Sequence, residues 1–345
     1  MRCPQLNDLP EPPPGKKGWP WTEESTPLPS PDAQRLPRIT VVTPSFNQGT
    51  FLEETIRSVL LQGYPDLEYI VLDGGSTDGS LEVIKKYSRW LTYWVSEPDG
   101  GQSNAINRGV TMSSGLFATW INSDDMLCKD ALCQHTCRIG FEPNTVYLGI
   151  CIYIDESGSI LCAHRGRIHS LDDLVRIRKV WRGEPERGHI VQPEVLFPRD
   201  LMLAVGGLDV NNHSTMDYEL WGKFLISGAQ FRYTDIQFGL FREHPKQKIR
   251  DGLRQTNSLL NTAAKLVLQA DCFSEEMKSE LLADLRSYGE TYENDYWKAT
   301  GRLARLGLPR QIVLAFRRLR GVFQNEKNAP SLPSGKKSAK AAQFS

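Results

Sequence analysis

The chain has 345 residues, of which 40% are hydrophobic and 24% charged, the composition of an ordinary globular protein. Its 41 basic and 41 acidic residues give a formal net charge of zero, so no global positive field points to nucleic acid as a partner. No apolar run reaches the roughly 20 residues that a membrane span needs, and the first 20 residues lack the apolar core of a signal peptide. We therefore expect a cytoplasmic protein.

Composition and pattern divide the chain into parts. Ten of the 21 prolines fall in residues 1–37, which predicts an extended or poorly ordered segment that could pack over a neighbouring surface. The expected parts are a Pro-rich extension (1–37), a main domain in two halves (38–130 and 131–250), a helical region (251–325) and a disordered tail (326–345).

In the first half, apolar runs rich in β-branched residues alternate with helical patterns. The expected order is strand 39–46, helix 51–62, strand 67–75, helix 80–91, strand 92–99, helix 102–113 and strand 116–125. Thr50 and Glu53 form a T-x-x-E sequence that predicts a capping box for the first helix. Strands that alternate with helices imply βαβ units. The predicted fold class is therefore α/β, with a mostly parallel central sheet flanked by helices.

The second half is expected to begin with a helix after Asp130, followed by a hairpin over residues 145–161. Residues 164–189 are polar and basic with little periodicity, which predicts a mobile excursion. An amphipathic helix is expected over residues 216–228. From residue 251 the pattern is helical to about residue 323.

Polar side chains follow three of the predicted strands in the first half. They are the groups Thr43–Asn47, Asp73–Asp78 and Asn122–Asp125. Ligands of an open parallel sheet bind outside the carboxyl ends of its strands, and a carboxylate there can accept from a base N–H or from ribose hydroxyls. A tight turn with a helix cap would explain each group alone, but three in order favour a nucleotide pocket. No G-x-G-x-x-G follows the first strand and no P-loop occurs, so a dinucleotide site is disfavoured.

The adjacent carboxylates Asp124 and Asp125 are preceded by the apolar run ATWIN. Two such charges at the end of a buried strand repel each other unless a cation is present. Hard oxygen ligands suit Mg²⁺ or Mn²⁺, which one or two carboxylates hold together with the phosphates of a substrate. A solvated turn that caps a helix is the alternative.

Four segments together resemble a known family. TPSFNQGTFLEETIRSVLLQ, DGGSTDGS, EPDGGQSNAINRG and NSDD are similar to the successive motifs of family 2 glycosyltransferases with the GT-A fold. The resemblance is strong over residues 39–129 and looser, through GGLD, MDYELW and FREHPKQK, to about residue 249. It implies a nucleoside-diphosphate-sugar donor, most often a UDP-sugar, Mn²⁺ or Mg²⁺ as cofactor, and transfer with inversion. The implied acceptor is a glycan or a lipid-linked molecule in polysaccharide or cell-surface glycan assembly.

The resemblance also implies site residues by position. Asn104 stands where many members of the family have an aspartate. Asp125 and His244 would hold the metal, and Arg242 or Lys248 could meet phosphate. The residues implied to line the nucleotide and donor site are Pro44, Ser45, Asn47, Asp73, Ser76, Asp78, Asp99, Gly100, Gly101, Asn104, Asn107 and Asp124.

The family carries its catalytic base just before a helix, and Asp217 in STMDYELW falls on that position. Met216 replaces the acidic residue that often precedes the base, and Glu219 is the second candidate. Asp217 could also serve only to start its helix. The stretch from Trp181 to His189 could close over donor and acceptor.

Two other functions stay open from the sequence. A sugar-phosphate nucleotidyltransferase would share the sheet and the metal carboxylates, and a catalytically silent binding protein would share the pocket. Residues 301–320 contain six arginines and no acid, with Ile312, Phe316 and Leu319 at helical spacing. This pattern fits either an amphipathic helix on the inner face of an anionic membrane or a helix docked on the main domain.

Overall fold

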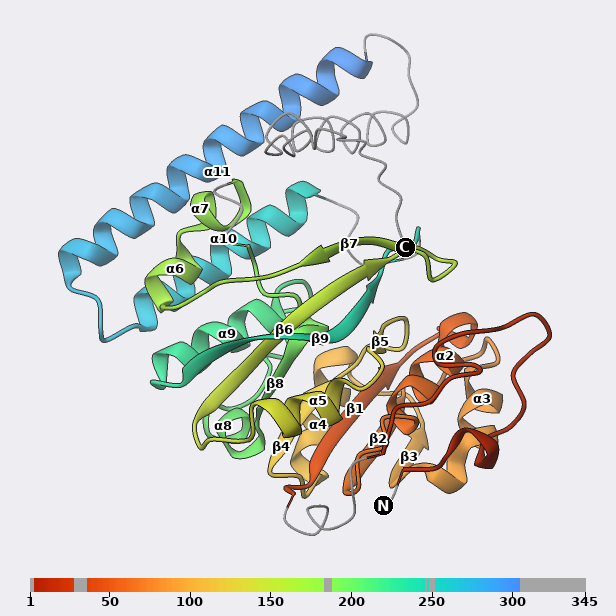
Figure 1. Cartoon of the computed structure of the whole chain (residues 1–345). Coiled ribbons are helices and arrows are strands. Elements are labelled where there is room, and N and C mark those ends of the chain that lie inside the picture. The colour runs from red at the N-terminus through yellow and green to blue at the C-terminus, as the bar shows by residue number, and fades with distance from the viewer. Residues whose placement is uncertain (1–2, 28–35, 183–187, 246, 248–251, 305–345) are drawn as a thin grey trace, which may run out of the picture. The chain divides into compact units, whose positions relative to one another are not determined.

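A computed structural model gives the structure of the chain. It describes residues 3–27, 36–182, 188–245, 247 and 252–304. The chain separates into one compact unit, Met1–Gly289, and a second, Glu290–Ser345, of which the description covers the end of one helix. The predicted α/β class is confirmed, because a central sheet is flanked by helices in the first unit (Figure 1).

The sheet runs in the order β3-β2-β1-β4-β8-β6-β9-β5, and β7 pairs with β6. It is parallel from β3 through β4 and again between β6 and β9, whereas β8, β5 and β7 run antiparallel to their neighbours. The strands are β1 (Ile39–Ser45), β2 (Leu67–Asp73), β3 (Tyr93–Ser96), β4 (Phe117–Trp120), β5 (Met126–Leu127), β6 (Thr145–Ile154), β7 (Ile160–His164), β8 (Val195–Pro198) and β9 (Gln230–Arg242).

Strands β1, β2 and β4 are buried along their whole length, because helices cover both faces of this part of the sheet. In the first half the helices are α2 (Gly49–Leu60), α3 (Ser80–Tyr87), α4 (Gln102–Met112) and α5 (Ala131–Arg138). In the rest of the chain they are α6 (Leu171–Val175), α7 (Ile177–Arg182), α8 (Arg199–Ala204), α9 (Met216–Ile226), α10 (Gly252–Gln269) and α11 (Glu275–Ala304).

The mobile excursion predicted for residues 164–189 is wrong over its described part. This stretch contains α6 and α7, with Leu171 and Leu174 buried and the Ser170 side chain accepting from the backbone N–H of Asp173. Helices of five or six residues are too short to show a period in the sequence. Closure of the stretch from Trp181 to His189 stays a prediction, because part of it lies outside the described residues.

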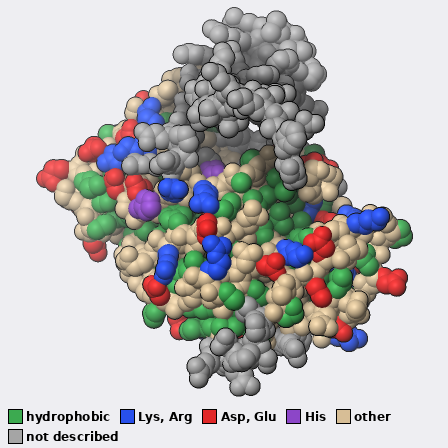
Figure 2. Space-filling model, in the orientation of Figure 1, with side chains coloured by type: hydrophobic (Ala, Val, Ile, Leu, Met, Phe, Trp, Pro, Cys, Tyr) green, Lys and Arg blue, Asp and Glu red, His purple; other side chains and the backbone are tan. Residues whose placement is uncertain are grey.

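The helical region expected from residue 251 is present as α10 and α11, which a short break separates. Most of the arginine-rich stretch and the whole tail (326–345) lie outside the described residues, so the membrane contact expected there stays a prediction. Within the described chain, no helix combines the length and apolarity that crossing a membrane requires. On the face shown in Figure 2, acidic and basic side chains are intermixed, which agrees with the net charge of zero.

The capping box predicted from Thr50 and Glu53 is wrong. Helix α2 begins at Gly49, two residues earlier than predicted, and its N-cap Gln48 makes no side-chain capping bond. The backbone N–H of Gly49 instead donates to the Asp78 carboxylate at 2.8 Å. A loop 29 residues further along the chain therefore satisfies the first turn of the helix, which a local motif could not reveal.

The N-terminal segment, residues 3–27, packs on α2. Arg57 of α2 is fully buried, and its guanidinium donates to the carbonyl oxygens of Pro10, Pro20 and Trp21. A buried guanidinium is costly unless acceptors satisfy its N–H groups. The N-terminal segment supplies these acceptors, so it forms part of the folded core.

Candidate active site

The carboxyl ends of β1, β2 and β3 lie side by side, with Ser45 opposite Asp73 and Asp73 opposite Ser96. The buried Asp73 carboxylate accepts from the Ser76 backbone N–H at 2.9 Å, the Ser76 hydroxyl at 2.5 Å and the Ser96 hydroxyl at 2.7 Å. The Ser45 hydroxyl is buried and has no hydrogen-bond partner within the described chain. An unsatisfied buried hydroxyl at this edge fits a place where a ligand supplies the missing group.

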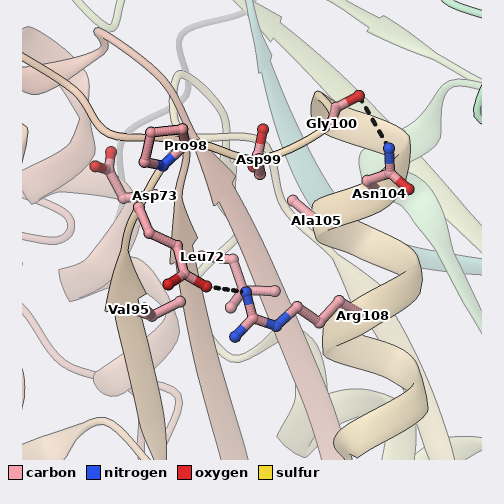
Figure 3. A pocket seen from close by; sticks show the side chains of 10 residues that line it. Leu72, Asp73, Val95, Pro98, Asp99, Gly100, Asn104, Ala105 and Arg108 are labelled. Atoms are coloured by element: carbon pink, nitrogen blue, oxygen red, sulfur yellow. Dashed lines mark hydrogen bonds and ion pairs between the residues drawn. The ribbon is translucent and has the colours of Figure 1, made fainter.

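A hollow of about 350 Å³ opens beside Asp73, between the strand ends and α4 (Figure 3). The Asp99 carboxylate accepts from the N–H of Gly101, and the Asn104 amide donates to the carbonyl of Gly100. The hollow has the size of a small-molecule site. Its lining residues are Leu72, Asp73, Val95, Glu97, Pro98, Asp99, Gly100, Asn104, Ala105 and Arg108. The structure thus brings together several of the residues that the sequence placed at the nucleotide.

Phe46 lies next to this hollow, and the sequence analysis did not select it. Its ring is 62% exposed. A Cβ built on Gly74 would stand 3.3 Å from that ring and 3.2 Å from the Asp99 carboxylate. Phe46 and Asp99 therefore both lie close to Gly74, which has no side chain to keep them apart. The available signal was an aromatic residue inside an otherwise polar strand end.

We expect Phe46→Ala to weaken binding of a nucleoside diphosphate about 5- to 150-fold, because stacking of one base on an aromatic ring contributes roughly 1–3 kcal/mol. Phe46→Tyr should bind like the wild type. Ile160→Ala is the matched control, since Ile160 is also a large, exposed hydrophobic residue, on β7. Isothermal calorimetry measures the affinities, and an unchanged affinity in Phe46→Ala would exclude the stacking role.

In the turn after β4, the two adjacent carboxylates of Asp124 and Asp125 lie in different surroundings. Asp125 is 1% exposed, and its oxygens accept from the Arg242 backbone N–H at 2.9 Å and the Asn122 amide at 3.2 Å. Burial and the neighbouring charge of Asp124 raise the pKa of the Asp125 carboxyl well above its usual value. Asp124 is partly exposed, and its carboxylate lies 3.0 Å from Nε2 of His244. The side chain that pairs with His244 is therefore Asp124, while Asp125 holds the turn from inside.

The Asp124 carboxylate and the His244 imidazole are suitable ligands for a divalent cation whose other ligands come from a substrate. No three His, Cys, Asp or Glu side chains in the described ranges stand close enough to hold a metal by themselves. Mg²⁺ and Mn²⁺ are commonly bound through one or two protein ligands plus substrate phosphates, so a two-ligand site meets this requirement. The Phe51 ring, 4.9 Å from that of His244, supports the imidazole.

Arg242 does not reach a phosphate, contrary to the expectation from sequence. Its side chain is 1% exposed, and its guanidinium donates to the Asp124 carbonyl and the Glu54 carboxylate. These contacts direct the guanidinium towards the protein interior, away from solvent. Lys248, the other expected phosphate contact, lies outside the described residues.

Asp217 lies in the first turn of α9, half-buried, close to the amino end of α4. The contact between the Ser103 hydroxyl and the Met216 sulfur, 2.8 Å, joins the starts of the two helices. Gln102, next to Ser103, donates to the Asn122 side chain at 2.8 Å. The start of α4 therefore links the helix of the candidate base, through Ser103 and Gln102, to Asn122 in the turn that carries Asp124.

Glu219, the second candidate for the base, is tied into the protein interior. It is 1% exposed, and its carboxylate accepts from Lys265 and Asn212, each at 2.7 Å. A buried carboxylate with two such donors serves the packing of α9 on α10. This leaves Asp217 as the better placed candidate.

Three other expected donor residues make contacts that build the scaffold. Asp78 accepts from Gly49 and from the Ser80 hydroxyl, between the amino ends of α2 and α3. The Asn47 backbone N–H donates to the Ser76 hydroxyl, and its side-chain oxygen accepts from the Thr77 N–H. Asn107 makes two hydrogen bonds to the backbone of Leu208. A nucleotide contact by these three side chains stays a prediction.

The parallel part of the sheet carries polar groups at its strand ends, and Asp124 in the turn after β4 pairs with His244, which follows β9. This is an α/β arrangement of the GT-A type. Residues 40–181 match the family model described as Glycosyl transferase family 2. This stretch therefore matches a family 2 glycosyltransferase domain, in agreement with the resemblance seen in the motifs of the chain.

Several proteins to which the chain is similar are also described as glycosyltransferases. An uncharacterized glycosyltransferase of Rickettsia prowazekii is 26% identical over 207 residues, which are 59% of this chain and 61% of that relative. A putative teichuronic acid biosynthesis glycosyltransferase, TuaG of Bacillus subtilis, is 32% identical over 99 residues, 28% of this chain and 39% of TuaG. The crystal structure of S. aureus TarS 1–349 with UDP-GlcNAc covers 72% of this chain and 71% of its own, at 19% identity and a TM-score of 0.53, a likeness of fold.

Proposed function

We propose that the protein is a metal-dependent glycosyltransferase that moves a sugar from a nucleoside diphosphate to an acceptor hydroxyl, with inversion. One observation carries the proposal: the hollow beside Asp73 and the Asp124–His244 pair belong to the same end of one sheet. UDP is our first choice of nucleotide, since TarS, which has a similar fold, binds UDP-GlcNAc. A role in polysaccharide assembly is supported by the similarity to TuaG, a putative teichuronic acid biosynthesis glycosyltransferase.

In the proposed mechanism, Asp73 and Phe46 bind the base side of the donor, and Asp124 with His244 holds the metal. When bound, Mn²⁺ or Mg²⁺ neutralises the charge of the leaving diphosphate. Asp217 takes the proton of the acceptor hydroxyl as that oxygen attacks the anomeric carbon. The bond from that carbon to the diphosphate oxygen breaks on the opposite face, and the diphosphate leaves with the electron pair. Attack and departure on opposite faces invert the configuration.

A screen of UDP, GDP, dTDP and CDP tests this function. We expect one diphosphate to raise the melting temperature, and only when Mn²⁺ or Mg²⁺ is present. The matching nucleotide sugar should then be hydrolysed slowly without an acceptor, releasing the diphosphate. Binding without any release would instead identify a silent binding protein, and the absence of binding by all four diphosphates would contradict the nucleotide-sugar function.

A further inference from the structure

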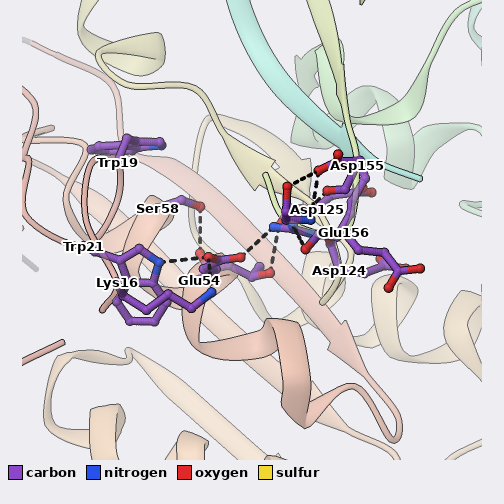
Figure 4. A network of polar contacts seen from close by, with 12 residues as sticks. Lys16, Trp19, Trp21, Glu54, Ser58, Asp124, Asp125, Asp155 and Glu156 are labelled. Atoms are coloured by element: carbon purple, nitrogen blue, oxygen red, sulfur yellow. Dashed lines mark hydrogen bonds and ion pairs between the residues drawn. The ribbon is translucent and has the colours of Figure 1, made fainter. Parts of the chain in front are cut away.

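We propose that Trp21, Glu54 and Arg242 are positioning residues for the turn that carries Asp124 and Asp125. Through them the N-terminal segment, residues 3–27, becomes part of the support of the active site (Figure 4). The proposal rests on the proposed function where it gives Asp124 a metal to bind. The mechanical connection between the segment and the turn does not depend on that function.

Arg242 holds the turn at two points. Its Nε donates to the Asp124 carbonyl at 2.9 Å, and its backbone N–H donates to the Asp125 carboxylate at 2.9 Å. The rest of the guanidinium donates to the carbonyls of Asp155 and Glu156 and to Glu54. A buried guanidinium keeps such an arrangement only if each N–H has a partner and a nearby charge compensates it.

Glu54 of α2 supplies the carboxylate that pairs with this guanidinium, at 2.7 Å, and its side chain is only 12% exposed. The other oxygen of the same carboxylate accepts from the Trp21 indole N–H at 2.8 Å and from the Lys16 ammonium at 3.1 Å. The N-terminal segment thus fixes the orientation of the carboxylate that pairs with the Arg242 guanidinium. A rotation of Glu54 would leave a buried guanidinium without its counter-charge.

The segment also contacts the chain just beyond the turn. The Trp19 indole N–H donates to the Leu127 carbonyl at 2.9 Å. From α2, the Thr55 hydroxyl donates to the Asp125 carbonyl at 2.7 Å and Ser58 accepts from the Leu127 N–H at 3.1 Å. The segment and α2 therefore hold both sides of the turn, and this places the N-terminal segment within the positioning machinery.

Trp21→Phe and Glu54→Gln in the full chain test the connection. The first removes the indole N–H and keeps a ring on α2; the second keeps the shape and removes the charge. Without any ligand, we expect hydrogen exchange at the amides of Asp125, Leu127 and Arg242 to accelerate about fivefold, the size of effect that one lost hydrogen bond produces. Amides of β2 should exchange as in the wild type.

Glu23→Gln is the matched control, because it weakens another contact of the same segment, the exposed 2.9 Å ion pair with Lys129, and leaves the Trp21–Glu54–Arg242 contacts in place. Unchanged exchange at the turn in both test variants would overturn the proposal. So would equal acceleration in Glu23→Gln, or acceleration that includes β2, since either result means a general loss of stability.

The dissociation constant for Mn²⁺ in the presence of UDP gives the second readout. We expect it to rise several-fold in Trp21→Phe and to stay at the wild-type value in Glu23→Gln. If the wild type binds neither Mn²⁺ nor any nucleoside diphosphate, the proposed function fails, while the exchange result still decides the positioning role. If the wild type binds both and Trp21→Phe binds Mn²⁺ equally well, the positioning role is overturned and the function stands.

Discussion

Replacing Asp217 with asparagine is expected to lower the rate of sugar transfer about 10²- to 10⁴-fold, the usual contribution of a positioned general base. The amide keeps the size of the side chain but cannot take the proton of the acceptor hydroxyl. Affinity for the nucleoside diphosphate should stay the same, because the role of Asp217 lies on the acceptor side. Single-turnover rates with saturating donor, together with calorimetric titration of the diphosphate, measure the two effects separately.

Glu219→Gln is the control on the same helix. Its carboxylate is bonded to Lys265 in the interior, so the substitution should lower the melting temperature. In the folded fraction, transfer should continue at a rate close to that of the wild type. A fast Asp217→Asn variant beside an inactive, folded Glu219→Gln variant would reverse the two assignments.

Asp124→Ala is expected to abolish the metal-dependent stabilisation by a nucleoside diphosphate. A ligand present at 100 times its dissociation constant adds about 2.7 kcal/mol to the free energy of unfolding, and the variant should lose this increment. His244→Gln should weaken the same effect, since His244 faces the Asp124 carboxylate. Thermal melting of the wild type and both variants, with UDP and increasing Mn²⁺, measures the loss.

Asp125→Asn provides the contrast, because the sequence assigned the metal to Asp125 whereas the structure buries that side chain. The second oxygen of its carboxylate accepts from the Asn122 amide, and the NH₂ of an asparagine cannot accept that bond, so the variant should lose about 1–3 kcal/mol of stability without ligand. The increase in the free energy of unfolding that UDP with Mn²⁺ produces should be the same as in the wild type. If Asp125→Asn removes that increment and Asp124→Ala keeps it, the assignment made from the sequence is the correct one.

Much of the fold follows from local pattern. Runs such as ITVVTPS are rich in β-branched residues and contain no charged residue, which indicates a strand buried on both faces without reference to any partner. The spacing of Leu52, Ile56 and Val59 likewise predicts α2. Because parallel strands present their carboxyl ends at one edge, the grouping of Ser45, Asp73 and Asn122 could also be expected from the sequence.

By itself, then, the sequence determined the α/β class, the resemblance to family 2 glycosyltransferases and the edge of the sheet where the candidate site lies. The tertiary structure decided which of the two adjacent carboxylates faces outward, and which groups support the turn. Asp125 is held by Arg242, 117 residues away, and Arg242 by Glu54, 188 residues away. Contacts between residues so far apart in the sequence depend on how β9, α2 and the N-terminal segment pack against one another. No local sequence pattern specifies that packing.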